Sequence, residues 1–141
     1  MHSIYLAGAI TGLDWESAEG WRIKIKSKVE NITNGRWICV NPCEHIPHKN
    51  FTDNTEKECM KWDIWKLKQC DVVVCDFSHP ISIGTSWELG TAYEYNIPII
   101  GVFTAPSKEE VHPWWKIAAM HICEDLVDLE KYLQKHFLRG D

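Results

Sequence analysis

The chain has 141 residues, of which 45% are hydrophobic and 25% charged, and its formal net charge is −5. This length fits a single domain over residues 1–141. The negative charge argues against binding along a nucleic acid backbone, which requires a basic surface. No apolar run is long enough to span a membrane, and the N-terminus lacks a signal-peptide pattern, so we expect a cytoplasmic protein with reduced cysteines and no membrane partner.

Apolar runs that end at Gly, Pro or Asn predict strands, whereas apolar residues spaced three and four apart predict helices. In chain order, the sequence predicts a strand over 3–10, a helix from Trp15 to about Asn31, a strand over 36–42, a helix over 55–69, a strand over 71–77, a helix over about 85–96, a strand over 97–103, a short strand over 118–123 and a helix over 126–137. Residues 43–54 are predicted to be irregular, and the stretch with Pro106 and Pro113 to be a loop.

Strands thus alternate with helices four or five times. This order predicts an α/β three-layer sandwich with a mainly parallel, flavodoxin- or Rossmann-like sheet of four or five strands. The run DVVVCDF at 71–77 is typical of a central parallel strand that is covered on both faces. Ligands bind beyond the carboxyl ends of such strands, so site residues are expected within 8–15, 42–50, 76–88 and 103–115.

Glu88 lies in the sequence SIGTSWELG, just inside a predicted helix. If Thr85 is the N-cap of this helix, T-x-x-E forms a capping box, and helix capping alone would explain the glutamate. The alternative is chemical. A carboxylate kept ionised by the helix start, and open to a ligand at the strand end, can act as a nucleophile.

Two further acids are candidates. Asp63 borders the apolar stripe of the helix over 55–69, where it is either a salt-bridged edge residue or a second site acid. Asp71 and Asp76 bracket the strand over 71–77, and Asp76, at the carboxyl end, is the better site candidate.

Other motifs give weaker signals. Cys39, Cys43, His45 and His48 are zinc-binding residue types, but no second C-x-x-C pair supports a metal site, and none is predicted. The loop SHPISIGTS could hold a phosphate or a sugar hydroxyl before the helix. The patterns of the P-loop, the dinucleotide fingerprint and the serine-hydrolase elbow are not present.

Four blocks together resemble the nucleoside 2-deoxyribosyltransferase family. They are IYLAGAITG at 4–12, WR at 21–22, DIWKLKQCDVVV at 63–74 and SIGTSWELGTA at 82–92. The blocks cover about the first two thirds of the chain. Each block is weak by itself, and the combination is specific. The segment after about residue 104, including His112, Trp114 and Trp115, departs most from the family pattern.

The resemblance implies a role for several residues. Glu88 matches the nucleophile that attacks C1′ of the deoxyribose, Asp63 the acid that contacts the base and manages its proton, and Tyr5 a tyrosine near the nucleophile. Ser82, six residues before the glutamate, matches the position that binds the 5′ end of the sugar. The positions expected to contact the substrate are Gly8, Ala9, Trp15, Asp76, Ser82 and Gly84. Stacking on the base could involve Trp15, Trp87 or Trp114.

The same positions leave the reaction open. Family members that exchange bases on free nucleosides often have aspartate at the position of Ser82. The related 2′-deoxynucleoside 5′-monophosphate N-hydrolases have serine there, but they also have a serine at the position of Ala9. We therefore expect cleavage of the N-glycosidic bond of 2′-deoxynucleosides or their 5′-monophosphates through a covalent intermediate on Glu88, with transfer of deoxyribose between nucleobases.

Two alternatives stay open beside transfer. The protein could be a 5′-monophosphate N-hydrolase, or a nucleotide-binding sensor without catalysis, because a fold does not fix a function. The expected partners are a nucleoside or nucleotide and a free nucleobase, and neither a metal nor an organic cofactor is required. The resemblance also implies a homo-oligomer whose active sites lie near subunit interfaces.

Overall fold

Five strands and five α-helices lie within the described part of the chain. The computed structural model describes residues 1–10, 12–45, 53–80, 82–107 and 109–139, with the backbone alone at 45 and 53–56. The strands are β1 (His2–Ala7), β2 (Trp37–Val40), β3 (Val72–Asp76), β4 (Ile99–Val102) and β5 (His121–Cys123). The helices are α1 (Trp15–Ile32), α2 (Asp53–Leu67), α3 (Ile83–Glu94), α4 (Pro113–Ala118) and α5 (Leu126–His136), with a short 3-10 turn at Pro42–His45.

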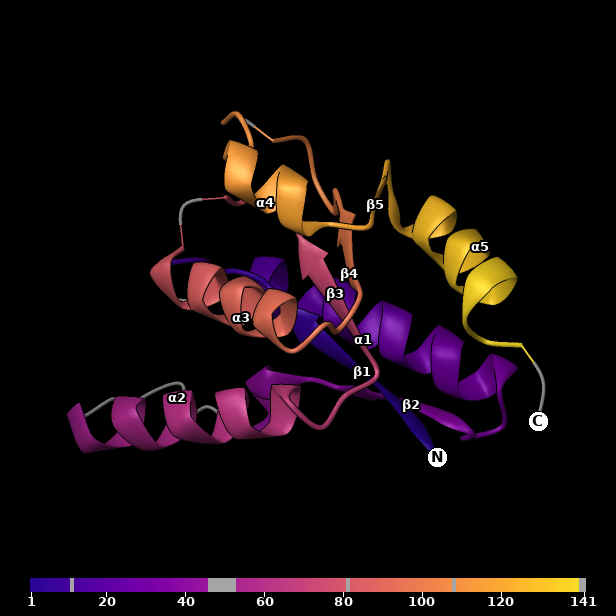
Figure 1. Cartoon of the computed structure of the whole chain (residues 1–141), viewed down its shortest axis with the longest axis horizontal. Coiled ribbons are helices and arrows are strands. Elements are labelled where there is room, and N and C mark those ends of the chain that lie inside the picture. The colour runs from indigo at the N-terminus through magenta and orange to yellow at the C-terminus, as the bar shows by residue number, and fades with distance from the viewer. Residues whose placement is uncertain (11, 46–52, 81, 108, 140–141) are drawn as a thin grey trace.

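The five strands form one parallel sheet in the order β2-β1-β3-β4-β5 (Figure 1). This is a flavodoxin-like order, and it confirms the predicted α/β architecture. β1 and β3 are neighbours whose register runs from Ile4 opposite Val72 to Ala7 opposite Cys75. Their carboxyl ends therefore meet at the same edge of the sheet, although 69 residues separate the two ends along the chain (Asp76 minus Ala7).

Helices cover both faces of the sheet, with α1 and α5 on one face and α2, α3 and α4 on the other (Figure 1). The first apolar layer contains Trp21, Ile25, Val29, Leu129 and Leu133 from the helices. The second layer contains Leu67, Leu89, Ala92 and Trp115 from the helices. Since β1 and β3 carry apolar residues to both layers, the two central strands are buried on both faces, as the run DVVVCDF predicts.

Several observed elements differ from the predicted ones: α2 begins at Asp53, α3 begins at Ile83, and β5 begins at His121, and two further differences have a clear physical reason. β1 ends at Ala7 rather than at residue 10, because Gly8 has a φ of +152° that turns the chain out of the strand. The predicted loop around Pro113 contains α4, which begins at this proline. Proline is tolerated at the first helical position, and the His112 side chain caps the helix by accepting a hydrogen bond from the Trp114 N–H at 3.1 Å.

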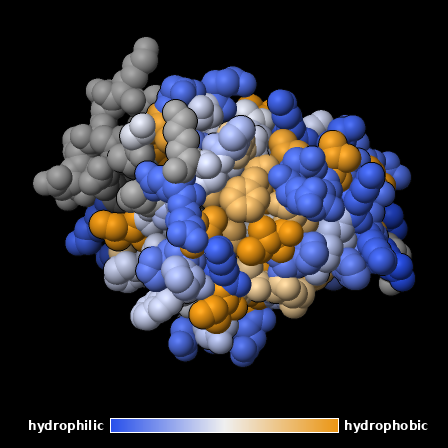
Figure 2. All heavy atoms as spheres, turned by 90° about the horizontal axis from the view of Figure 1, so that it is seen from above, coloured by the Kyte–Doolittle hydropathy of each residue, from blue (hydrophilic) through white to orange (hydrophobic). Residues whose placement is uncertain are grey.

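Three further features concern the helices, the cysteines and the surface. No helix within the described ranges is long and apolar enough to cross a membrane. Five of the six cysteines are buried, and no disulfide joins cysteines of the described residues. Seen from above, apolar side chains gather in the middle of the face and polar side chains surround them (Figure 2).

Candidate active site

The carboxyl ends of β1 and β3 form the topological switch point of the sheet. The chain leaves β1 toward α1 on one face and leaves β3 toward α3 on the other, so the two connections diverge there. In open α/β sheets of this kind, ligands bind in the crevice that these diverging connections leave. The residues at and around the two strand ends are therefore the candidates for an active site.

Glu88 reaches this crevice from the second turn of α3. Its Oε2 accepts a hydrogen bond of 2.5 Å from the hydroxyl of Tyr5, which lies on β1. The N-cap of α3 is Ser82, whose Oγ accepts from the Thr85 N–H at 3.1 Å. The predicted capping box with Thr85 as N-cap is therefore wrong, and helix capping does not explain Glu88.

Tyr5 is completely buried, with 0% of its surface exposed. Burial, together with the Glu88 and Asp63 carboxylates, raises the pKa of Tyr5 far above its ordinary value. The phenol consequently stays neutral, and its O–H is the donor in the bond to Glu88. One oxygen of the Glu88 carboxyl group is held by this bond, and the residues that the structure describes donate no hydrogen bond to the other oxygen, Oε1.

Asp63 is the second acid near this crevice, and it comes from α2 on the same side of the sheet as α3. Burial raises the pKa of Asp63 to about 7, although the positive charge of Arg22 lowers it. Burial also raises the pKa of Glu88 to about 7, while the hydrogen bond from Tyr5 lowers it, Asp63 raises it and Arg22 lowers it. Two partly buried acids that titrate near neutral pH can divide the roles of base and acid between them.

The other candidates at the strand ends are packed into the protein. Gly8 is buried, and a Cβ atom added to it would lie 3.1 Å from the Cβ of Asp76. Asp76 is 1% exposed; its Oδ1 accepts from the Ser78 N–H at 2.9 Å, and its Oδ2 lies 3.4 Å from His79 Nδ1. Asp76 thus fixes the turn after β3, and Ala9 is buried next to Gly8.

Ser82 and Gly84 lie at the N-terminus of α3, where backbone N–H groups favour an anion. A Cβ atom on Gly84 would have no neighbour within 4 Å, so the backbone there is open. The Thr85 Oγ1 atom is buried without a hydrogen-bond partner among the described residues. Trp15 is placed at the start of α1, and its Nε1 donates to Glu19 at 2.9 Å.

Two buried polar residues near the strand ends were not identified from the sequence. Arg22 is buried beneath the crevice and lowers the pKa of both acids. The sequence did contain a signal for the burial of Arg22. Arg22 lies four residues after Ala18 and three before Ile25, within the buried stripe of α1. Ser78 joins two loops, since its hydroxyl accepts from the Thr104 and Ala105 N–H groups and donates to the Ala105 carbonyl.

The metal candidates are only partly described. Cys39 and Cys43 are buried, and the side chain of His45, together with all of His48 and residues 46–50 of the predicted site segment, lies outside the described residues. Among the residues that the structure does describe, no group of three or more potential ligands could hold a metal ion.

Comparison with known proteins identifies the family of the chain. The family model described as nucleoside 2-deoxyribosyltransferase like matches residues 1–105. The match includes Tyr5, Asp63 and Glu88. The chain therefore belongs to the nucleoside 2-deoxyribosyltransferase-like family, which confirms the resemblance of the four sequence blocks.

Solved structures agree on the fold. A 2-deoxyribosyltransferase from Bacillus psychrosaccharolyticus superimposes with a TM-score of 0.71 at 20% identity, over 92% of this chain and 91% of that one. A conserved protein from Enterococcus faecalis gives a TM-score of 0.74 at 13% identity, over 97% and 99%. The CMP N-glycosidase BcmB from Clostridium botulinum gives 0.58 at 17% identity, over 94% and 98%. A search of curated proteins found no match.

We predict that Glu88→Gln removes a pH-dependent loss of stability. Because the pKa of Glu88 is raised to about 7 from 4.5, the folded protein binds more protons than the unfolded chain between these pH values. The free energy of unfolding should therefore fall as the pH rises from about 4.5 to 7. Glutamine keeps the acceptor for Tyr5 without the charge, so the variant should gain at least about 1 kcal/mol over wild type between pH 4 and pH 8.

Urea denaturation of both proteins at several pH values measures this difference. Glu94→Gln is the matched control, because Glu94 is an exposed glutamate of the same helix. A stability difference between Glu88→Gln and wild type that is the same at pH 4 and pH 8 would contradict the buried, proton-retaining carboxyl group.

Proposed function

We propose that the protein cleaves the N-glycosidic bond of 2′-deoxynucleosides or their 5′-monophosphates and transfers the deoxyribose between nucleobases. The observation that carries the proposal is the Tyr5–Glu88 hydrogen bond of 2.5 Å at the switch point of a family member, with Asp63 nearby. A carboxylate held by one oxygen, and a second acid close to it, are the two groups that cleavage of a glycosidic bond requires.

The proposed reaction has two steps. In the first, Glu88 Oε1 bonds to C1′ while the bond between C1′ and the base nitrogen breaks. The base leaves with the electron pair of that bond and takes a proton from Asp63. In the second, a nitrogen of another base attacks C1′, the ester bond to Glu88 breaks, and Asp63 takes up the proton that the incoming base releases.

The charges of the site suit this division of labour. Glu88 must be ionised to attack, and Asp63 must be protonated to give up its proton. Both have a pKa raised to about 7, chiefly by burial, so the two required forms coexist near neutral pH. Tyr5 stabilises the ionised form of Glu88, because its hydrogen bond lowers the pKa of that group.

A hydrolase that acts on nucleoside 5′-monophosphates is the second candidate function. Ser82 favours it, because a serine at the N-terminus of α3 places a hydroxyl and backbone N–H groups together without a negative charge. In this reaction, water replaces the second base and deoxyribose 5-phosphate is the product. The two candidates share the first step, and they differ only in the acceptor.

Glu88→Ala is expected to abolish release of the base while the protein remains folded. The carboxylate is the proposed nucleophile, and its loss should slow turnover at least about 1,000-fold. The measurement is chromatography of products after incubation with each 2′-deoxynucleoside and each 5′-monophosphate, with and without a second base. Turnover near the wild-type rate in Glu88→Ala would contradict the mechanism.

The same assay separates transfer from hydrolysis. A new nucleoside that forms only when an acceptor base is present supports the transferase. Base that is released without an acceptor, mainly from monophosphates, supports the hydrolase. Binding of a nucleotide with no release of base, even after long incubation, would support a sensor.

Ser82→Asp tests where the 5′ end of the substrate binds. Aspartate is as good an N-cap as serine, so α3 should remain folded. Its negative charge near a bound phosphate should lower the kcat/KM ratio of monophosphate to nucleoside at least about tenfold. Ile83→Asp is the control, because it adds the same charge at a side chain that is 88% exposed. An unchanged ratio, or an equal fall in both variants, would place the 5′ end elsewhere.

We further propose that the protein is a homo-oligomer in the cytoplasm and that an apolar groove contributes to the contact between subunits. The groove measures about 1150 Å³ and lies between α2, α3 and α4, apart from the Tyr5–Glu88 pair. It is bordered by Trp87, Trp114 and Ile117, which are 58%, 78% and 72% exposed. Large apolar side chains gathered at one surface are typical of subunit contacts.

Light scattering of the purified protein measures its mass in solution. We expect at least twice the chain mass of 16.4 kDa, and a shift to the monomer in Trp114→Glu. Val127→Glu is the control, since Val127 is 61% exposed on α5, across the sheet. A monomeric wild-type protein at assay concentrations would contradict the oligomer.

A further inference from the structure

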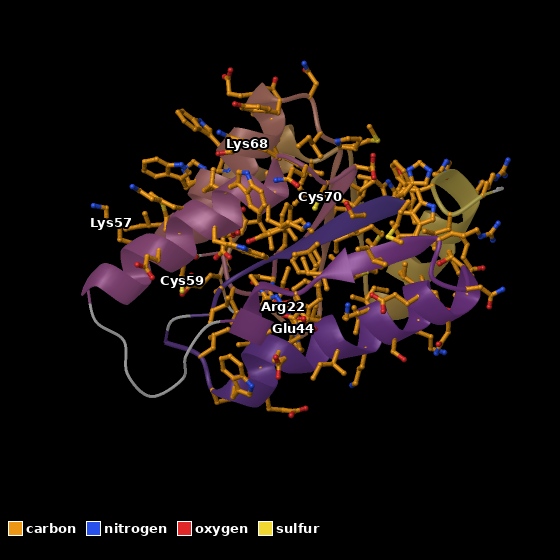
Figure 3. All side chains as sticks on the ribbon, turned by 90° about the horizontal axis from the view of Figure 1, so that it is seen from below. Arg22, Glu44, Lys57, Cys59, Lys68 and Cys70 are labelled. Carbon is orange, nitrogen blue, oxygen red and sulfur yellow. The ribbon has the colours of Figure 1, made fainter. Side chains whose placement is uncertain are left out.

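Arg22 is the largest side chain that is fully buried in the described part of the chain, with 0% of its surface exposed. It lies on α1 near the turn that carries Glu44 (Figure 3). Its Nε donates to the Leu6 carbonyl at 3.1 Å, its Nη2 to the Gly8 carbonyl at 3.0 Å, and its Nη1 to the Ala18 carbonyl. The guanidinium group is thus tied to the end of β1 and to the first turns of its own helix.

This burial is costly, because arginine keeps its charge in proteins and a buried charge loses its hydration. Among the described residues, no carboxylate forms an ion pair with Arg22, and the Glu44 side chain is exposed to solvent. Its neighbours are instead the carbonyl groups, the Cys43 Sγ atom, which accepts from Nη1 at 3.6 Å, and the Trp21 ring, whose centroid is 4.9 Å away. A tie between helix and strand needs hydrogen bonds but no charge, so the charge itself requires an explanation.

The position of the cation supplies this explanation. A Cβ atom on Gly8 would lie 3.3 Å from Arg22 Nη2 and 3.1 Å from the Cβ of Asp76. The guanidinium group therefore lies directly under the point where β1 and β3 end, which is the floor of the proposed active site. The φ of +152° at Gly8 is held in place by the bond to its carbonyl.

We propose that Arg22 is a positioning residue of this site, whose permanent cation fixes the Gly8 peptide and supplies the positive charge against which the Glu88 and Asp63 carboxylates are held. The role of Arg22 in catalysis rests on the proposed function. The electrostatic part concerns the folded protein alone, and substrate is not needed to test it.

The groups that face the two acids come from every surrounding element. Glu88 faces Tyr5 on β1, Cys75 on β3, Asp63 on α2 and Arg22 on α1. Burial raises the pKa of both Tyr5 and Cys75, so these two groups stay neutral. Asp63 faces Arg22 as well. Arg22 is therefore a cation that acts on both acids, and it lowers the pKa of each against the effect of burial.

The test is a titration of the two carboxyl carbons by NMR in wild type and in Arg22→Gln. Signals are assigned by their loss in Glu88→Gln and Asp63→Asn. Because Arg22 lowers the pKa of both acids, its removal should raise the titration midpoints of Glu88 and Asp63 by about one pH unit. Lys26→Gln is the matched control. Lys26 is another α1 cation that donates to a strand carbonyl, that of Cys39 at 2.9 Å, and its loss should leave both midpoints in place.

A folded Arg22→Gln protein whose midpoints are unchanged would overturn the proposal, because a purely structural arginine would behave in this way. A midpoint shift in a protein that never releases base would support the role of Arg22 and contradict the proposed function instead. The two failures are thus distinguishable.

Arg22→Lys decides the question if Arg22→Gln does not fold. Lysine restores the charge but cannot reach three carbonyl groups at once, because it lacks the planar fork of arginine. The midpoints should then stay within about half a pH unit of wild type, while the backbone amide signals of Ala9 and Ile10 should move. Midpoints that rise in this variant, or amide signals that stay, would contradict the proposal.

Discussion

The hydrogen bond between Tyr5 and Glu88 is the interaction on which the site depends. It joins residues 83 positions apart, one on a central strand and one on a helix that covers it. For this bond to form, β1 must be buried on both faces, and α3 must begin early enough for its second turn to pass over the strand. The phenol must also remain neutral, which its burial secures. This one contact therefore requires the burial of β1 in the sheet, the early start of α3 and the neutral form of Tyr5.

Burial gives the site its chemistry and also its cost. A carboxylate loses hydration when it is buried. Burial of the Glu88 and Asp63 carboxylates therefore costs folding free energy that exposed acids would not cost. The same loss brings both pKa values close to neutral pH, where one acid can be ionised and the other protonated. Arg22 limits the cost with a charge that is itself buried. Stability is thus given up at the place where the proposed reaction needs unusual acids.

The sequence was sufficient for the architecture because the alternation of strands and helices leaves few arrangements of a parallel sheet. The run DVVVCDF identified the central strand β3 by its apolar character alone. Tyr5, Asp63 and Glu88 were found through the family resemblance, and the structure brings them together. Local signals at the chain reversals were less informative. Gly8 ended β1 early, and Pro113 began a helix where a proline suggested a loop, because proline suits both settings.

Arg22 was missed because sequence patterns treat a charged residue as exposed. Its burial depends on carbonyl groups of β1, which lie about 16 residues away in sequence and become acceptors only when α1 packs on the sheet. Position within the apolar stripe of α1 could have identified it. A charged residue within an apolar stripe indicates either that the helix is wrongly predicted or that the charge has a function. The regular spacing of Ala18, Ile25 and Val29 supports the helix and so argues against a wrong prediction.

The cap of α3 shows how a small local choice decides a chemical role. Thr85 and Ser82 are both good N-cap residues, and the sequence does not choose between them. With Thr85 as cap, Glu88 would fold back onto the helix start and satisfy its own backbone. With Ser82 as cap, the helix gains three residues, and Glu88 moves almost one turn into it, where its carboxylate meets Tyr5 instead of a free N–H group. The hydroxyl of Ser82 therefore releases Glu88 from a structural task, and this release leaves the carboxylate available for the role of nucleophile that we propose for it.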